Sequence, residues 1–136
     1  MKKYFNNSTL HMSIAFSLYF GYEIYHEIFE HMETFDKWSV LRISKYLLII
    51  TSLFFFNKFT YIANRGKLFS QQAANLWKQI ALTLLTLGIL SFVELRFNNG
   101  EAIHFTSCIF LATFCLAMSN IFKEATAIKE DNDLTI

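Results

Sequence analysis

The chain has 136 residues, enough for one domain, and its composition is 54% hydrophobic, 18% aromatic and 17% charged. Ordinary soluble domains are roughly a quarter charged, so this composition indicates a membrane protein. The net charge of +1 offers no excess that would favour nucleic acid, and direct nucleic-acid binding is not expected. Cys108 and Cys115 lie seven residues apart in one apolar run, and we expect them to pack as small apolar side chains without forming a disulfide.

The first expected membrane helix covers residues 8–31. Nineteen residues without a formal charge separate Lys3 from Glu23, which is long enough to cross a hydrocarbon core of about 30 Å. Lys2 and Lys3 precede the apolar run as they do in a signal peptide, but no small-residue cleavage site follows. We therefore expect a retained helix.

The second expected helix, over residues 39–63, is the weakest candidate span. Arg42, Lys45 and Lys58 interrupt it and leave twelve consecutive uncharged residues, which is short for a membrane crossing. Because lysine and arginine side chains near helix ends can extend to the interface, we still expect this segment to cross.

The third and fourth expected helices cover residues 71–96 and 101–129. The third has fifteen uncharged residues, and about nineteen if Trp77 and Leu95 mark the membrane interfaces. The fourth has twenty-one residues free of Lys, Arg, Asp and Glu and is the strongest span. The chain contains no proline, so we expect straight helices.

Short polar segments separate these helices. Gly66 suits the left-handed position at a helix end, and Ser70 can accept a backbone hydrogen bond as the N-cap of the third helix. Residues 98–100 (Asn-Asn-Gly) predict a similar turn, and residues 34–36 predict another break.

Basic residues predict the orientation. Residues 57–78 contain four Lys or Arg and no Asp or Glu, whereas residues 23–36 contain five Asp or Glu and no Lys or Arg. By the positive-inside rule, the loop between the second and third helices is cytoplasmic. The expected fold of residues 1–136 is thus all-α: one four-transmembrane-helix antiparallel bundle, with both termini in the cytoplasm and a short cytoplasmic helical extension at the C-terminus.

Arg42 and Lys45 fall on the outer side in this orientation and oppose it. A hairpin folded near Asp36 places Glu27 level with Lys45. The same hairpin places Glu30 level with Arg42. We predict that these two pairs neutralise the two cations.

Two segments resemble a known family. One reads Arg-Gly-Lys-Leu-Phe-Ser over residues 65–70 and leads into Ala-Asn-Leu at 74–76. The other is the tail, residues 121–136, which ends in Glu-Asp-Asn-Asp-Leu-Thr-Ile. Both are similar to the uncharacterised bacterial membrane proteins catalogued as domain of unknown function 2975, although Ala125 stands where that family would have a glycine. The match runs from the second helix to the tail.

This resemblance implies four membrane helices in a bacterial cytoplasmic (inner) membrane, and it supplies no activity. Members are often encoded beside a small helix-turn-helix regulator. By association alone, the resemblance implies a membrane partner of a transcription factor.

Ionisable residues at the outer end form the first candidate site. Folding the third and fourth helices about Asn99 brings Glu94 near the level of His104, and an ionisable pair at membrane depth is a functional-site hypothesis. The simpler alternative is a structural ion pair or a solvated helix end. The candidate outer polar cluster, which can line one outward-facing cavity, is Glu23, His26, Glu27, Glu94 and His104.

Residues 26–31 (His-Glu-Ile-Phe-Glu-His) superficially resemble a zinc-binding HExxH motif. Their two histidines stand five residues apart, however, so on a helix they face away from each other. We expect no metal, no cofactor and no catalytic residue, and therefore a protein that is not an enzyme.

The cytoplasmic end holds the second candidate site. Helical spacing of Ile121, Phe122, Ala125 and Ile128 predicts that the fourth helix continues beyond the membrane. The acidic stretch that follows either binds a basic protein surface or packs on the basic loop of the same chain. The candidate partner surface is Arg65, Lys67, Glu130, Asp131 and Asp133.

Two function hypotheses follow. The first is a non-enzymatic integral membrane protein that serves as a regulatory or sensing partner of a cytoplasmic helix-turn-helix regulator. The alternative is a small homo-oligomeric channel or transporter with an outward-facing polar site. The expected partners are the lipid bilayer, a cytoplasmic protein and, in the alternative, further copies of the chain.

Overall fold

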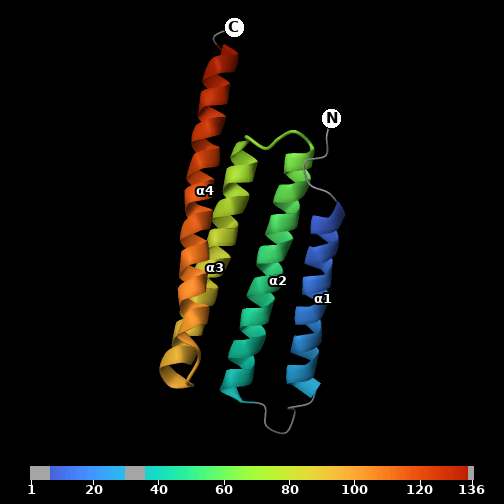
Figure 1. The fold of residues 1–136 in the computed structure, drawn as a ribbon, viewed down its shortest axis with the longest axis vertical. Coiled ribbons are helices and arrows are strands. Elements are labelled where there is room, and N and C mark those ends of the chain that lie inside the picture. Colours follow the sequence, from blue (N-terminus) through green and yellow to red (C-terminus); the bar gives the residue numbers. More distant parts are fainter. Residues whose placement is uncertain (1–6, 30–35, 135–136) are drawn as a thin grey trace.

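The computed structural model describes residues 7–29 and 36–134, and within these residues all regular secondary structure is α-helical. Four helices follow one another: α1 (Asn7–Phe29), α2 (Lys37–Asn64), α3 (Gln71–Phe97) and α4 (Ala102–Leu134) (Figure 1). The sequence predicts an end of the fourth helix at residue 129, but α4 continues to Leu134. The helix thus runs through Asp131, Asn132 and Asp133, although aspartate and asparagine are weak helix formers.

Local sequence signals place the connection between α2 and α3. Gly66 has φ 75° and donates its N–H to the carbonyl of Ala63 at 3.0 Å, which confirms the predicted left-handed position. Ser70 has extended backbone and accepts a hydrogen bond from the N–H of Ala73 at 3.2 Å. The predicted N-cap is thus confirmed, and this connection is short because both of its ends are capped.

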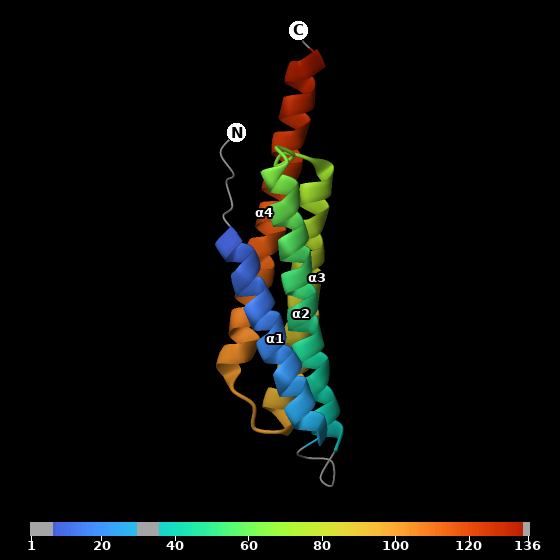
Figure 2. The ribbon, with the colours of Figure 1, turned by 90° about the vertical axis from the view of Figure 1, so that its right-hand side faces the viewer.

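The four helices pack in chain order, α1 on α2, α2 on α3 and α3 on α4, and successive helices run antiparallel (Figure 1). Among the described residues, no other pair of helices brings Cα atoms within 8 Å of each other. In the view of Figure 2, α1 and the first half of α4 lie on the same side of the α2 and α3 pair. The antiparallel bundle is therefore open between its first and last helices.

Aromatic side chains hold α2, α3 and α4 together at the end of the α2–α3 connection. Phe59 and Phe122 are buried and their ring centroids lie 5.7 Å apart; the ring of Trp77 packs against both, with centroid distances of 5.1 Å and 6.3 Å. The indole N–H of Trp77 is buried without a hydrogen-bond partner within the described residues. Trp77 is partly buried overall and packs against the hydrophobic core.

Small side chains allow α3 and α4 to approach closely. A Cβ atom added to Gly88 would lie 3.2 Å from Cδ1 of Ile109, and the hydroxyl of Ser119 donates to the main-chain carbonyl of Ala74 at 2.9 Å. Cys115 is buried in this contact and Cys108 is half-buried; both are free thiols. The two cysteines therefore act as small packing residues on one face of α4.

Three of the helices, α2, α3 and α4, are long and apolar enough to cross a membrane. Large apolar side chains on them face outward, for example Phe54, Ile89 and Phe110 with exposed fractions of 62%, 61% and 73%. So much exposed apolar surface is typical of helices that face lipid, and the chain is accordingly a membrane protein. The segment predicted to be the weakest span, α2, meets this criterion, whereas the described part of the first predicted span, α1, does not.

Candidate functional site

The first turns of α2 organise a polar cluster at the end of the molecule where α3 joins α4. Asp36 precedes α2 as its N-cap, and its carboxylate accepts hydrogen bonds from the N–H groups of Trp38 at 2.9 Å and Ser39 at 3.0 Å. These bonds, with that from Ser39 the strongest contribution, hold the pKa of Asp36 below its usual range. Asp36 therefore fixes the residue at which α2 begins.

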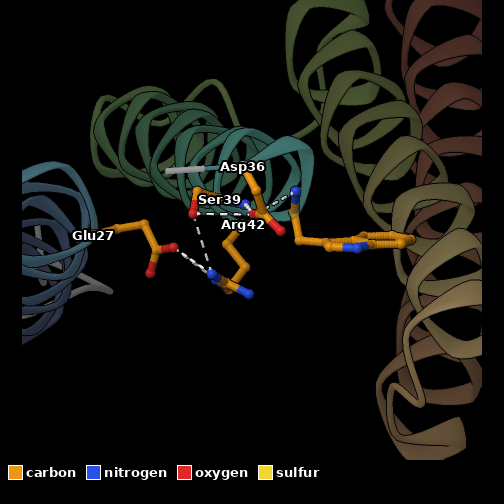
Figure 3. Close-up of polar contacts among 5 residues, drawn as sticks. Glu27, Asp36, Ser39 and Arg42 are labelled. Carbon is orange, nitrogen blue, oxygen red and sulfur yellow. Dashed lines mark hydrogen bonds and ion pairs between the residues drawn. The ribbon is translucent and has the colours of Figure 1, made fainter. Parts of the chain in front are cut away.

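Arg42 lies one turn beyond Ser39 and reaches across to α1. Its Nε and Nη2 atoms donate to Oε1 of Glu27 at 2.9 Å and 2.5 Å, and Nη2 also donates to the hydroxyl of Ser39 at 3.3 Å (Figure 3). Glu27 is buried, with an exposed fraction of 8%. Paired charges on facing helices are the usual way to hold ionisable groups within an apolar structure.

A second ion pair connects α2 to α3. Lys45, one turn after Arg42, donates to Oε2 of Glu94. The two side chains are 17% and 16% exposed, so the pair is largely shielded from solvent. Cations on α2 thus lie between a carboxylate of α1 and a carboxylate of α3.

The turn between α3 and α4 begins at the same glutamate. The main-chain carbonyl of Glu94 accepts hydrogen bonds from the N–H groups of Asn98 at 2.8 Å and Gly100 at 3.2 Å. Asn99 between them has φ 49°, and a Cβ atom on Gly100 would lie 2.8 Å from the main-chain nitrogen of Leu95. The Asn-Asn-Gly sequence is therefore required for the chain to fold back tightly over the end of α3.

These groups surround a cavity of about 320 Å³. It is open on one side and is formed by α2, the last turn of α3, residues 98–101 and the first turn of α4. Its ionisable lining residues are Arg42, Lys45, Tyr46, Glu94, Glu101 and His104.

The structure brings together part of the predicted outer polar cluster. Glu94 and His104 line the same cavity, and Glu27 reaches its edge through Arg42. Glu23 and His26 lie on α1 and are not among the lining residues. His104 is 61% exposed and lies 3.5 Å from Glu101, its neighbour on the same turn.

The predicted ion pairs of α1 with α2 are corrected by the structure. Glu27 pairs with Arg42, where the hairpin argument paired it with Lys45, and Lys45 pairs with Glu94 on α3. Glu30, predicted to pair with Arg42, lies outside the described residues. The register of two helices depends on the path of their connection, so pairing by equal distance from Asp36 misplaced the partners by about one turn.

The positions of His, Cys, Asp and Glu side chains bear on metal binding. Residues 7–29 and 36–134 contain no group of three or more His, Cys, Asp and Glu side chains placed to hold a metal ion. His31, the second histidine of the predicted motif-like segment, falls outside those residues.

The second candidate surface lies at the opposite end, around the α2–α3 connection. Arg65 and Lys67 are exposed, and the guanidinium of Arg65 lies over the ring of Tyr61 at 4.4 Å. Beyond this connection α4 continues alone (Figure 1). Its residues 127–133, which include Glu130, Asp131 and Asp133, are all exposed.

The four residues whose spacing predicts the continuation of the fourth helix all lie in α4, but they are not all buried. Phe122 is buried and Ala125 is half-buried against the other helices, but Ile121 and Ile128 are 55% and 62% exposed. The two isoleucines lie seven residues apart, two turns along α4, and so share a face that the chain itself leaves uncovered.

Sequence reasoning identified Glu94 and His104 but not the other side of the cavity. Arg42 and Lys45 had been assigned only to neutralising pairs, and Tyr46 and Glu101 to no site. The signal was present, because two cations in the first third of an apolar helix require partners, and residues 98–100 carry a turn motif.

Comparisons with known proteins place the chain in a family. No curated protein and no solved structure matches it. A family model described as "Protein of unknown function (DUF2975)" matches residues 37–136, from the first residue of α2 to the end of the chain, which includes every residue that lines the cavity. The resemblance seen in the basic glycine turn and the acidic tail is confirmed, and the chain belongs to the DUF2975 family.

Proposed function

We propose that this protein is a non-enzymatic regulator of the bacterial cytoplasmic membrane, which binds a cytoplasmic protein through the projecting end of α4 and the α2–α3 connection. One observation carries the proposal: α4 runs past the other helices, and its residues 127–133 are exposed on all sides. The partner we infer is a small helix-turn-helix regulator of the kind encoded beside members of this family.

The length of α4 supports a part outside the membrane. At 1.5 Å per residue its 33 residues extend about 50 Å, whereas about 20 residues cross a hydrocarbon core of about 30 Å. Roughly 13 residues, or about 20 Å of helix, therefore remain to project into water. A helix end of that length presents side chains at fixed positions, as a recognition element requires.

The chemistry of the projecting end favours a protein partner. Ile128 is 62% exposed on a turn that also carries Lys129 and Glu130, so an apolar side chain stands among charged ones. Protein–protein interfaces commonly combine an apolar centre with a polar rim. Closer to the membrane, Arg65 and Lys67 are basic, whereas the end of α4 is acidic. A partner with one acidic and one basic region would contact both the α2–α3 connection and the end of α4.

The proposed topology has four membrane crossings with both ends in the cytoplasm. Its support is the accumulation of Lys and Arg, without Asp or Glu, in residues 57–78. The ion pairs of Arg42 and Lys45 remove the main objection, since each cation at the opposite end has a carboxylate partner. This topology requires α1 to cross the membrane as well, in addition to the three helices that are long and apolar enough to do so.

Co-purification of the full-length protein with the regulator tests the proposal. We expect charge reversal at Glu130 and Asp133 (Glu130→Lys with Asp133→Lys), or truncation after Ala127, to lower recovery of the regulator at least tenfold. Truncation there retains Phe122 and Thr126, which are packed against the other helices. The matched control is Glu124→Lys, which reverses an exposed charge nearer the packed part of the same helix. Equal recovery with all variants would refute the proposal.

The alternative is a homo-oligomeric channel or transporter. The cavity beside Glu94 and His104 favours it, since an outward-facing polar site is what such a protein needs. Against it, the four helices are unbroken over their described lengths, and polar side chains inside them are engaged in pairs such as Asn57 with Ser13 and Ser52 with Thr83. Ion or solute flux in proteoliposomes, abolished by Glu94→Gln, would support this alternative over the first.

A further inference from the structure

The cavity at the α3–α4 end is lined by charges of both signs. Arg42 and Lys45 of α2 supply two cations. Glu94 of α3, which is paired with Lys45, and Glu101 just before α4 supply two carboxylates. With His104 neutral the formal charges of the lining cancel, although both signs are present.

Both cations retain hydrogen-bond donors for a ligand. Arg42 uses Nε and Nη2 for Glu27 and Ser39, while Nη1 has no hydrogen bond within the described part of the chain and points away from Glu27 (Figure 3). Lys45 donates one of its three N–H groups to Glu94. An anionic group can therefore bind to these two residues without breaking either ion pair.

The carboxylates retain hydrogen-bond acceptors. Glu101 is 74% exposed, and within the described residues its carboxylate makes one polar contact, at 3.5 Å from His104, so it is accessible to an ammonium group. Asn98 and Asn99 also line the cavity, and their side-chain amides can donate or accept. The volume of about 320 Å³ is at the lower end of the range for small-molecule sites.

The balance of charge indicates the class of ligand. A simple anion gains from Arg42 and Lys45 but is repelled by the carboxylates, and Glu27 already offsets part of the charge of Arg42. A simple cation is attracted by the carboxylates but repelled by Arg42 and Lys45. A molecule with an anionic group and an ammonium group a few atoms apart can bind the cations and the carboxylates at once, so its two charges are recognised together.

We propose that this cavity binds a small zwitterion, with its phosphate or carboxylate group on Arg42 and Lys45 and its ammonium group on Glu94 and Glu101. Two sources share this chemistry: the headgroup of phosphatidylethanolamine in the surrounding bilayer, and a free molecule such as phosphoethanolamine. The inference does not depend on a cytoplasmic partner, because the cavity lies at the other end of the helices.

Thermal unfolding of the purified full-length protein in a neutral detergent tests the proposal with both sources. The free arm titrates phosphoethanolamine and compares it with inorganic phosphate alone and with ethanolamine alone. The lipid arm compares mixed micelles of phosphatidylethanolamine with those of anionic phosphatidylglycerol. We expect a saturable rise in Tm with one or both zwitterions that exceeds the rise with either fragment or with phosphatidylglycerol. A rise in the lipid arm alone assigns the site to a headgroup, and a rise in the free arm assigns it to a soluble molecule.

Glu101→Gln is the informative variant, because this exposed side chain contributes little to folding. We expect about tenfold weaker binding of the zwitterion, the usual effect of losing one charge-assisted hydrogen bond. Glu124→Gln, at an exposed position far along α4, is the control and should bind as the unmodified protein does. The proposal is overturned if no zwitterion raises Tm, if phosphate alone acts as strongly as phosphoethanolamine, or if Glu101→Gln leaves binding unchanged.

Discussion

The ion pair between Lys45 and Glu94 joins α2 to α3, and its contribution to stability can be measured directly. Removing one partner of a buried ion pair costs about 3–5 kcal/mol, because the other charge is left without compensation. Lys45 and Glu94 are 17% and 16% exposed, and some solvent access lowers the cost. We therefore expect Lys45→Met alone, and Glu94→Leu alone, to reduce the free energy of unfolding by about 2–3 kcal/mol each.

The double variant separates the pair from its surroundings. Apolar residues of similar volume replace a buried ion pair with little loss, so Lys45→Met with Glu94→Leu should be within about 1 kcal/mol of the unmodified protein. The implied coupling energy is about 3 kcal/mol or more. Lys58→Met, at an exposed position of α2, is the control for loss of a lysine and should have little effect.

Reversible unfolding in mixed micelles, followed by tryptophan fluorescence, provides the measurement, because Trp77 lies in the aromatic core between α2, α3 and α4. A coupling energy below about 0.5 kcal/mol, within the error of additive behaviour, would refute the argument that this pair is shielded and structurally important. At a coupling energy of zero, the double variant would lose as much stability as the two single variants together.

Three further predictions concern the helix ends. Ser70→Ala removes the side-chain acceptor for the N–H of Ala73 and should reduce the free energy of unfolding by about 1 kcal/mol, measured in the same unfolding assay, with Ser70→Asp close to the unmodified protein. Gly66→Ala places a side chain at φ 75° and should lower stability by about 1 kcal/mol, whereas Gly66→Asn should be better tolerated. The pKa of Asp36 is lowered by its hydrogen bonds, so its contribution is complete above the ordinary value of about 3.9 and is lost as the pH falls through the folded-state pKa. The difference in Tm between the unmodified protein and Asp36→Asn should therefore shrink between pH 5 and pH 3, and a constant difference would contradict this account.

The family match covers the residues that line the cavity but does not cover α1. The matched segment starts at Lys37, so α1 lies outside it, although α1 supplies Glu27 to Arg42. Within the described residues the helix contacts of α1 are with α2, and this is the least extensive of the three helix–helix contacts. Polar links between the two helices include the ion pair of Glu27 with Arg42 and the hydrogen bond from Asn57 to Ser13.

Features that depend on near neighbours in the chain follow from local sequence signals. The helices, the left-handed Gly66 and the N-cap Ser70 follow from local preferences for backbone conformation and hydrogen bonding. The long apolar segments and the two family motifs are likewise written in consecutive residues. These signals need no knowledge of which helix lies beside which, and for that reason they could be predicted.

Which distant residues meet depends on how the helices pack. The partner of Lys45 proved to be Glu94, 49 positions further along the chain, and Trp77 proved to pack against Phe59 and Phe122. Both outcomes depend on the rotation of each helix about its axis and on its height relative to its neighbours. A shift of one turn moves a side chain by about 5.4 Å, enough to exchange one ion-pair partner for another, and uniform apolar periodicity does not specify that shift.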